Sequence, residues 1–134
     1  MNRKQVMEMF NRENRIGALA TSNSRGDVNV AVFGSPRMID EETVIMAIGD
    51  NRSFKYLQEN PKASFIVIEP GEAPTSWKGI RLYLEVDTFE RYGEVLDSFR
   101  ENIRKVAGDR SADAIQAAIR FKVVDIRPLI SPGP

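Results

Sequence analysis

The sequence predicts one mainly β domain, in which about six antiparallel strands form a small closed or partly split barrel with helices outside. Three observations predict this fold class. Six short segments either alternate apolar and polar residues or form brief apolar runs, as strands do. Most links between them have the length of a hairpin connection, and only one helical segment lies where a parallel crossover would need one. The length of 134 residues suits a single domain, 1–134, with one core.

The predicted strands are residues 16–21, 28–34, 44–48, 63–69, 79–90 and 119–124. Helical periodicity is found at residues 2–13, in a short segment that begins near residue 52, and at residues 92–106, with a further turn of helix within 111–118. On the helix at 92–106, a common apolar stripe is formed by Val95, Leu96, Phe99, Ile103 and Val106. We expect residues 128–134 to be a flexible tail.

Composition excludes several classes of protein. The chain contains 19 Lys and Arg residues and 19 Asp and Glu residues, without a long run of one sign. This balance argues against nucleic acid or an anionic membrane as the main partner. No segment is apolar over the length that a membrane span needs, and the charged, amphipathic start lacks an apolar signal core. The expected compartment is therefore the cytoplasm.

The chain has no cysteine and no histidine. Disulfides, thiolate nucleophiles and iron–sulfur clusters are thereby excluded, and the usual general base and the usual zinc or haem ligand are missing. We expect neither catalytic side chains nor a metal site. If the protein performs redox chemistry, a cofactor has to supply the reactive atoms.

Residues 44–61 form the stretch around which the chain is organised. A short apolar run begins at Val44, and Gly49 ends it. Asp50 and Asn51 are both good helix N-caps, and the apolar residues that follow have helical spacing. Pro61 ends the helix, because proline restricts the residue before it and cannot donate a backbone hydrogen bond. The pattern predicts a strand, a tight turn and one short helix.

The start of this short helix carries an electrostatic conflict. Arg52 lies in the first turn, and Lys55 follows it, although a helix N-terminus is already electropositive. A bound anion resolves the conflict, because Arg52, the Ser53 hydroxyl and the free amides of the first turn all donate hydrogen bonds. A phosphate group fits this description. The alternative interpretation is an ordinary capped surface helix with a solvated arginine.

Taken together, the predicted elements resemble the pyridoxamine 5′-phosphate oxidase-like FMN-binding split-barrel family. The first feature is a hairpin formed by residues 18–21 and 26–32, and the second is the strand, turn and helix with Asn51-Arg52-Ser53 and the closing residues 60–63. The third is Trp77-Lys78-Gly79 at the start of a long alternating strand, and the fourth is the strand at 121–126. The order and spacing of these features cover roughly residues 5–127.

The resemblance implies a six-stranded antiparallel split β-barrel of Greek-key type, and a homodimer with two FMN molecules at its interface. Arg52 and Ser53 correspond to the residues that hold the FMN phosphate, and the strand at 29–33 lies along the isoalloxazine ring. Trp77 either stacks near the flavin or across the dimer interface, or is a partly buried aromatic at a strand end. The predicted cofactor-binding residues are Asn29, Val30, Ala31, Val32, Phe33, Gly49, Asp50, Asn51, Arg52, Ser53, Lys55, Trp77 and Lys78.

The sequence departs from true pyridoxamine phosphate oxidases at its C-terminal strand. Those enzymes carry an Arg-x-His substrate clamp, whereas this chain continues Asp125-Ile126-Arg127-Pro128 and lacks histidine altogether. The same absence argues against the haem-degrading branch of the family. The resemblance leaves three functions: a small FMN-dependent oxidoreductase or electron carrier with a small-molecule or nicotinamide electron donor, a non-enzymatic flavin storage or sensor protein, and a reductase that binds the deazaflavin F420. An interaction domain without a cofactor is the remaining alternative.

Overall fold

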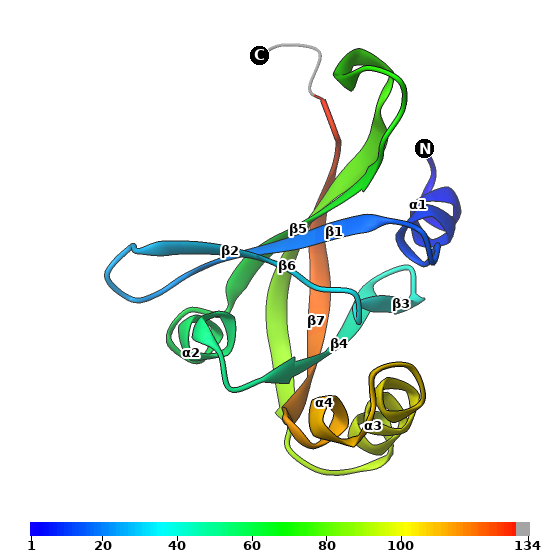
Figure 1. The fold of residues 1–134 in the computed structure, drawn as a ribbon. Coiled ribbons are helices and arrows are strands. Elements are labelled where there is room, and N and C mark those ends of the chain that lie inside the picture. The colour runs from blue at the N-terminus through cyan, green and yellow to red at the C-terminus, as the bar shows by residue number, and fades with distance from the viewer. Residues whose placement is uncertain (131–134) are drawn as a thin grey trace.

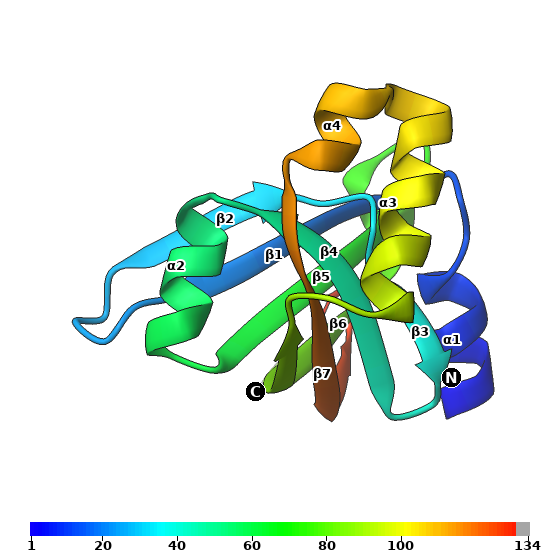
Figure 2. The same ribbon diagram turned by 90° about the horizontal axis from the view of Figure 1, so that it is seen from below.

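The computed structural model describes residues 1–130, which form one seven-stranded antiparallel sheet with four α-helices around it (Figures 1 and 2). The elements in chain order are α1 (Arg3–Phe10), β1 (Ile16–Ser22), β2 (Val28–Val32), β3 (Arg37–Asp40), β4 (Thr43–Gly49), α2 (Arg52–Glu59), β5 (Lys62–Glu69), a 3₁₀ turn (Pro74–Ser76), β6 (Lys78–Glu90), α3 (Glu94–Ala107), α4 (Asp109–Asp113) and β7 (Ile115–Pro128). The mainly β, antiparallel fold class predicted from the sequence is confirmed.

The sheet is an incompletely closed barrel. Its strand order is β2-β1-β5-β6-β7-β4-β3, so that its two edge strands are β2 and β3, which follow each other in the chain. The link between them contains Pro36, which cannot donate a backbone hydrogen bond. Ser35 takes the place of a strand partner at Ala47, because its hydroxyl oxygen accepts from Ala47 N and donates to Ala47 O, both at 3.1 Å. An open seam therefore runs between β2 and the β3–β4 side of the barrel.

The core lies inside this curled sheet and is closed at one end by α1. Val6, Met9 and Phe10 from α1 are buried, and the Phe10 ring lies 5.3 Å from the ring of Phe65 on β5. Large apolar side chains on alternate positions of the central strands complete the core, as expected for strands with one buried face.

Three sequence predictions need correction. The sheet has seven strands rather than six, because the segment after Ser35-Pro36 pairs with β4 as the four-residue strand β3. The first helix ends at Phe10 rather than residue 13. The next residue, Asn11, uses its side chain to hydrogen-bond the backbone N–H and C=O of Met38, each at 2.8 Å. The helical turn predicted within 111–118 is α4, which ends at Asp113, and the final strand begins at Ile115 rather than 119.

Helix α3 is less buried than its apolar stripe predicts, and the last strand, β7, is longer than its sequence pattern predicts. Of the apolar stripe on α3, Leu96 alone is buried, and Val106 is 85% exposed. β7 continues to Pro128, and Leu129 N–H donates to Gly79 O at 3.2 Å. The sheet thus continues into the segment 128–134 that was predicted to be a flexible tail, and residues 131–134 of that segment lie outside the described residues.

Candidate functional site

Helix α2 begins at the open seam, directly after β4, and its first turn is capped as predicted. Asn51 is the N-cap, and its side-chain oxygen accepts a hydrogen bond from Phe54 N at 2.9 Å. Lys55 N–H donates to Asn51 O at 3.1 Å. The N–H groups of Arg52 and Ser53 precede the first intrahelical bond and have no acceptor in the helix. Two amides and the positive end of the helix dipole are thus directed out of this turn.

A groove of about 760 Å³ separates α2 from the tip of the β1–β2 hairpin. Cations line both sides, with Arg25 on the hairpin tip and Arg52 and Lys55 on the helix. Arg25 is 3.3 Å from Asp27, whereas Arg52 and Lys55 form no ion pair within 4.0 Å among residues 1–130. The groove therefore presents two cations without an ion-pair partner at the start of a helix, with the carboxylates of Asp50 and Glu59 on the same lining. Cations at a helix N-terminus are the chemistry expected of an anion site.

The hairpin tip is attached to the other end of α2 by one carboxylate. The Ser24 hydroxyl donates to Glu59 Oε1 at 2.8 Å, and Ser24 N–H donates to the same oxygen at 3.3 Å. These two hydrogen bonds, followed by the charges of Lys55 and Arg25, lower the pKa of Glu59 below its usual value of 4.5. The contact joins the hairpin tip to the C-terminal end of α2 while Glu59 is ionised.

We expect Ser24→Ala to raise the pKa of Glu59 toward 4.5, because the hydroxyl donor contributes most to the lowering. A carboxylate with a lowered folded-state pKa stabilises the fold above its unfolded pKa and loses that contribution as the pH falls through the folded value. The contact between Glu59 and the hairpin tip should therefore be lost only at acidic pH. In Ser24→Ala, what remains of it should be lost at a higher pH than in the wild type. NMR titration of the Glu59 carboxyl carbon measures both values; an identical pKa in the two proteins would contradict this assignment.

Ser53 lies differently from the sequence prediction. Its side chain is only 1% exposed, and its oxygen accepts a hydrogen bond from Asn29 Nδ2 of β2 at 3.1 Å. The hydroxyl that was expected to face an anion is directed under the helix instead. Ser53 is not among the residues that line the groove, and its side chain joins α2 to β2 across the seam.

The free edge of β2 carries the other polar groups of the seam. Phe33 N–H donates to Gly17 O on β1 at 3.1 Å, and the register pairs Ala31 with Leu19. Hydrogen-bonded and non-hydrogen-bonded pairs alternate in an antiparallel ladder, so the N–H and C=O groups of Val30 and Val32 are directed away from β1. These backbone groups can hydrogen-bond a planar polar ligand that lies along the edge.

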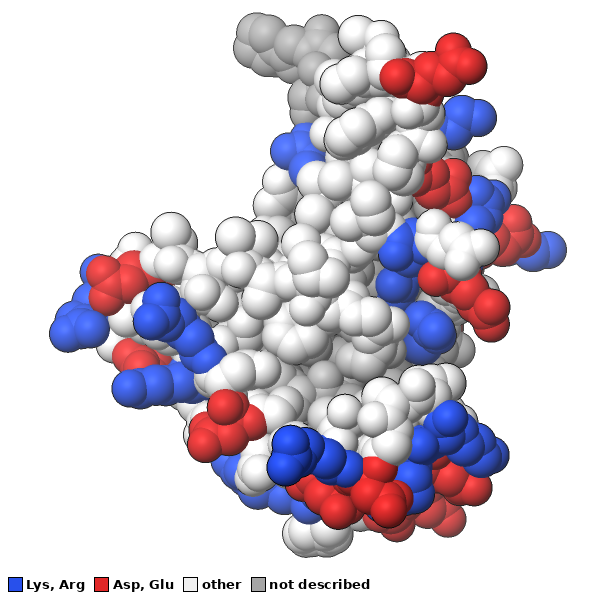
Figure 3. Space-filling model, in the orientation of Figure 1, with Lys and Arg blue, Asp and Glu red and all other residues white. Residues whose placement is uncertain are grey.

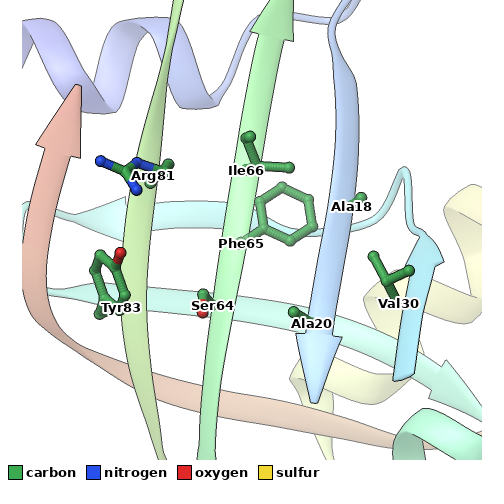
Figure 4. Close-up of a pocket in the computed structure, with 8 residues that line it drawn as sticks. All are labelled: Ala18, Ala20, Val30, Ser64, Phe65, Ile66, Arg81 and Tyr83. Carbon is green, nitrogen blue, oxygen red and sulfur yellow. The ribbon is translucent and has the colours of Figure 1, made fainter. Parts of the chain in front are cut away.

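The outer face of the sheet beside this edge is apolar and exposed. Val30 and Val32 are 69% and 76% exposed. A shallow pocket of about 230 Å³ continues across β1, β5 and β6 (Figure 4), and it is lined by Ala18, Ala20, Val30, Ser64, Phe65, Ile66, Arg81 and Tyr83. Figure 3 shows that charged side chains gather on the hairpin tip and around the lower and right-hand rims of the molecule, and that they are sparse on the face itself. Exposed apolar faces of this kind mark interaction sites, and Arg81 is the one charged residue among those that line this pocket.

Four other predicted residues lie on β2 or next to it, or between the end of β4 and the start of α2. Ala31 and Phe33 alternate with the exposed valines, and Phe33 packs against the core. Asp50 lines the groove with Arg52, whereas Gly49 packs closely against the chain before β7, where a Cβ would make a tight contact of 3.1 Å with Ala114 O.

Trp77 and Lys78 are not part of this cluster within one protomer. They line a separate hollow beside Pro128 and Leu129, beyond the end of β5 that is distant from α2. β5 has 8 residues and spans roughly 23 Å. Gly79, the third residue of that motif, has a packing role, since a Cβ there would lie 2.0 Å from Val67 O.

Comparison with known proteins gives the fold a context. No protein-family model matches the chain. An uncharacterised protein of Methanocaldococcus jannaschii is 30% identical over 88 residues, or 63% of this chain, and the matched region spans 59% of that relative. An FMN-binding protein from Syntrophomonas wolfei subsp. wolfei is 25% identical, with a TM-score of 0.83 over 96% of this chain and 86% of its own.

Two further solved structures share the fold at lower identity. A candidate pyridoxamine 5′-phosphate oxidase from Lactobacillus delbrueckii is 11% identical, with a TM-score of 0.67 over 92% of this chain and 91% of its own. An F420 reductase is 16% identical, with a TM-score of 0.69 over 90% and 94%. This chain has the pyridoxamine 5′-phosphate oxidase-like split-barrel fold that these structures share. A heme storage protein from Vibrio cholerae also has this fold, with 18% identity and a TM-score of 0.66 over 92% of each chain.

Sequence reasoning missed part of the split barrel's site. Arg25 and Ser24 reach the groove from the hairpin tip, and the outer face includes Ala20, Ser64 and Tyr83. The alternation of small residues with core residues along 18–21 was a usable signal for this face, because the positions between buried ones lie on the opposite side of a strand. The closeness of the hairpin tip to α2 had no comparable local signal in the sequence.

Among residues 1–130, no cluster of acidic side chains could hold a metal ion, and no helix is long and apolar enough to cross a membrane.

Proposed function

We propose that this split barrel is an FMN-binding flavoprotein that functions as a small flavin-dependent oxidoreductase or electron carrier. The observation that carries the proposal is the position of α2: its first-turn cations Arg52 and Lys55 line the groove, and its Ser53 is hydrogen-bonded to Asn29 of the edge strand β2. A phosphate site and an edge for a planar ring are thereby adjacent on one protomer. FMN combines a phosphate with a planar ring that can form hydrogen bonds, and both parts fit the residues present.

The chemistry of the proposal needs little from the side chains. A bound flavin supplies hydride or electron transfer at its ring, while the protein supplies orientation, hydrogen bonds and control of solvent access. The backbone groups of Val30 and Val32 would orient the ring, and Arg52 with the first-turn amides would hold the phosphate. A chain without histidine or cysteine can perform these tasks, whereas it lacks the usual haem ligand. The side chains therefore favour flavin over haem.

We further propose that the functional unit is a homodimer. The exposed valines of β2 and the shallow pocket beside them leave one side of any bound ring open, although cofactor sites usually bury most of their ligand. A second copy on this apolar face would cover that side. In such a dimer Trp77 and Lys78, which lie far from Arg52 in their own chain, would reach the site from the partner.

The absorbance spectrum of the purified protein tests the proposal, with mass spectrometry of the compound released on denaturation and the molar mass in solution. We expect bands near those of free flavin, the mass of FMN and the molar mass of two chains. A released compound with the mass of F420 would mean that the cofactor is the deazaflavin and not FMN. A protein that binds neither compound when reconstituted would overturn the proposal. Steady-state oxidation of a nicotinamide cofactor would then distinguish an oxidoreductase from a flavin storage protein.

A further inference from the structure

We propose that Asn29 is a positioning residue, which acts on the cofactor through Ser53 rather than by direct contact. Asn29 extends from β2 across the open seam, and its Nδ2 donates to the buried oxygen of Ser53 at 3.1 Å. Among residues 1–130 this is the one side-chain hydrogen bond that joins β2 itself to α2. The inference rests on the proposed flavin site, and it assigns this side chain a role within that site.

The bond lies at the open seam, where α2 packs against β1 and β2 but no strand pairing joins the two sides. β2 and α2 are separated in the sheet by the open edge of the barrel, because the two edge strands do not pair. The cross-strand neighbour of Asn29 is Thr21, which is 4% exposed and whose hydroxyl has no hydrogen-bond partner among the described residues. Thr21 therefore provides no second hydrogen bond. Among residues 1–130, the half-buried Asn29 and the buried Ser53 thus form the one side-chain hydrogen bond between β2 itself and the start of α2, while the Ser24–Glu59 contact joins the hairpin tip to the other end of the helix.

This distance matters to a ligand that uses both elements. The ring of FMN would lie along the β2 edge while its phosphate is held at the first turn of α2. Riboflavin has no phosphate and uses the β2 edge alone. If the Asn29–Ser53 bond fixes the span between the two half-sites, its loss should weaken FMN and leave riboflavin almost unchanged.

The test is a double-mutant cycle with Asn29→Ala, Ser53→Ala and the double variant, in which both flavins are titrated against each protein. We expect each single variant to weaken FMN about three- to tenfold, the usual range for one hydrogen bond. Riboflavin should change by less than about twofold. The double variant should be no weaker than the weaker single variant, because residues that act through one shared bond are not additive.

Two further variants keep the result interpretable. Asn102→Ala on the exposed side of α3 is the matched control and should leave both affinities unchanged. If Asn29→Ala does not fold, Ser53→Ala and Ser53→Thr provide the comparison, and the hydroxyl of threonine should restore FMN binding. Multiplicative losses in the double variant, or an equal loss of riboflavin, would overturn the role of Asn29.

The outcomes also distinguish this inference from the proposed function. A wild-type protein that binds neither flavin contradicts both. A wild-type protein that prefers FMN, and loses that preference in Arg52→Ala, supports the flavin site. An additive Asn29–Ser53 cycle in that same protein would then contradict the positioning role alone.

Discussion

Arg52→Ala should weaken FMN binding by roughly ten- to a hundredfold and leave riboflavin binding unchanged. The guanidinium lies in the first turn of α2, exposed to the groove and without an ion-pair partner among residues 1–130. A charge-assisted hydrogen bond to phosphate contributes about 1.5–3 kcal/mol, and each 1.4 kcal/mol corresponds to a tenfold change in affinity. Titration of both flavins against both proteins measures the difference directly.

The same substitution should not damage the fold. A cation at a helix N-terminus is unfavourable by a few tenths of a kcal/mol, so the apoprotein of Arg52→Ala should be equally stable or slightly more stable. Arg110→Ala on α4 is the matched control, because it removes one exposed positive charge that has no ion-pair partner among the described residues. If Arg52→Ala loses riboflavin as much as FMN, the arginine supports the ring or the fold, and the phosphate assignment is wrong.

The strand, turn and helix around Arg52 could be read from the sequence because every signal for it is local. Gly49 ends the strand, Asn51 caps the helix through Phe54 N, and the helix ends before Pro61, all within one short stretch. Cap geometry and proline depend on neighbours in the chain, not on tertiary packing. The prediction of this segment is therefore confirmed almost to the residue.

The site around that helix was less predictable because it depends on contacts distant in sequence. The buried Ser53 has its partner Asn29 across the seam, and the groove lies between α2 and a hairpin whose Ser24 contacts Glu59. Strand β3 was missed for a similar reason, since four residues after Pro36 become a strand only through pairing with β4. Register and seam position decide these features, and neither is encoded in a local pattern.

Val30→Glu should abolish the proposed homodimer and reduce flavin affinity more than a hundredfold, while the protomer remains folded. Val30 is 69% exposed in the single chain, so the substitution adds a charge to a solvated strand position. Surface substitutions of this kind usually change stability by less than about 0.5 kcal/mol. At an interface between two copies of the same face, the carboxylates would lose water without gaining a partner, and a buried unpaired charge is unfavourable by several kcal/mol.

Sedimentation equilibrium and flavin titration, with and without the substitution, measure the two effects. Val106→Glu is the matched control, because Val106 is 85% exposed on α3 and is not among the residues that line the pocket on the sheet face. That control should keep the mass of two chains and full flavin affinity. A specific interface buries about 800 Å² on each partner, and a charge at the centre of such an area cannot reach solvent. If Val30→Glu remains dimeric and binds FMN normally, the second copy does not occupy this face, and Trp77 and Lys78 cannot reach the ring by this route.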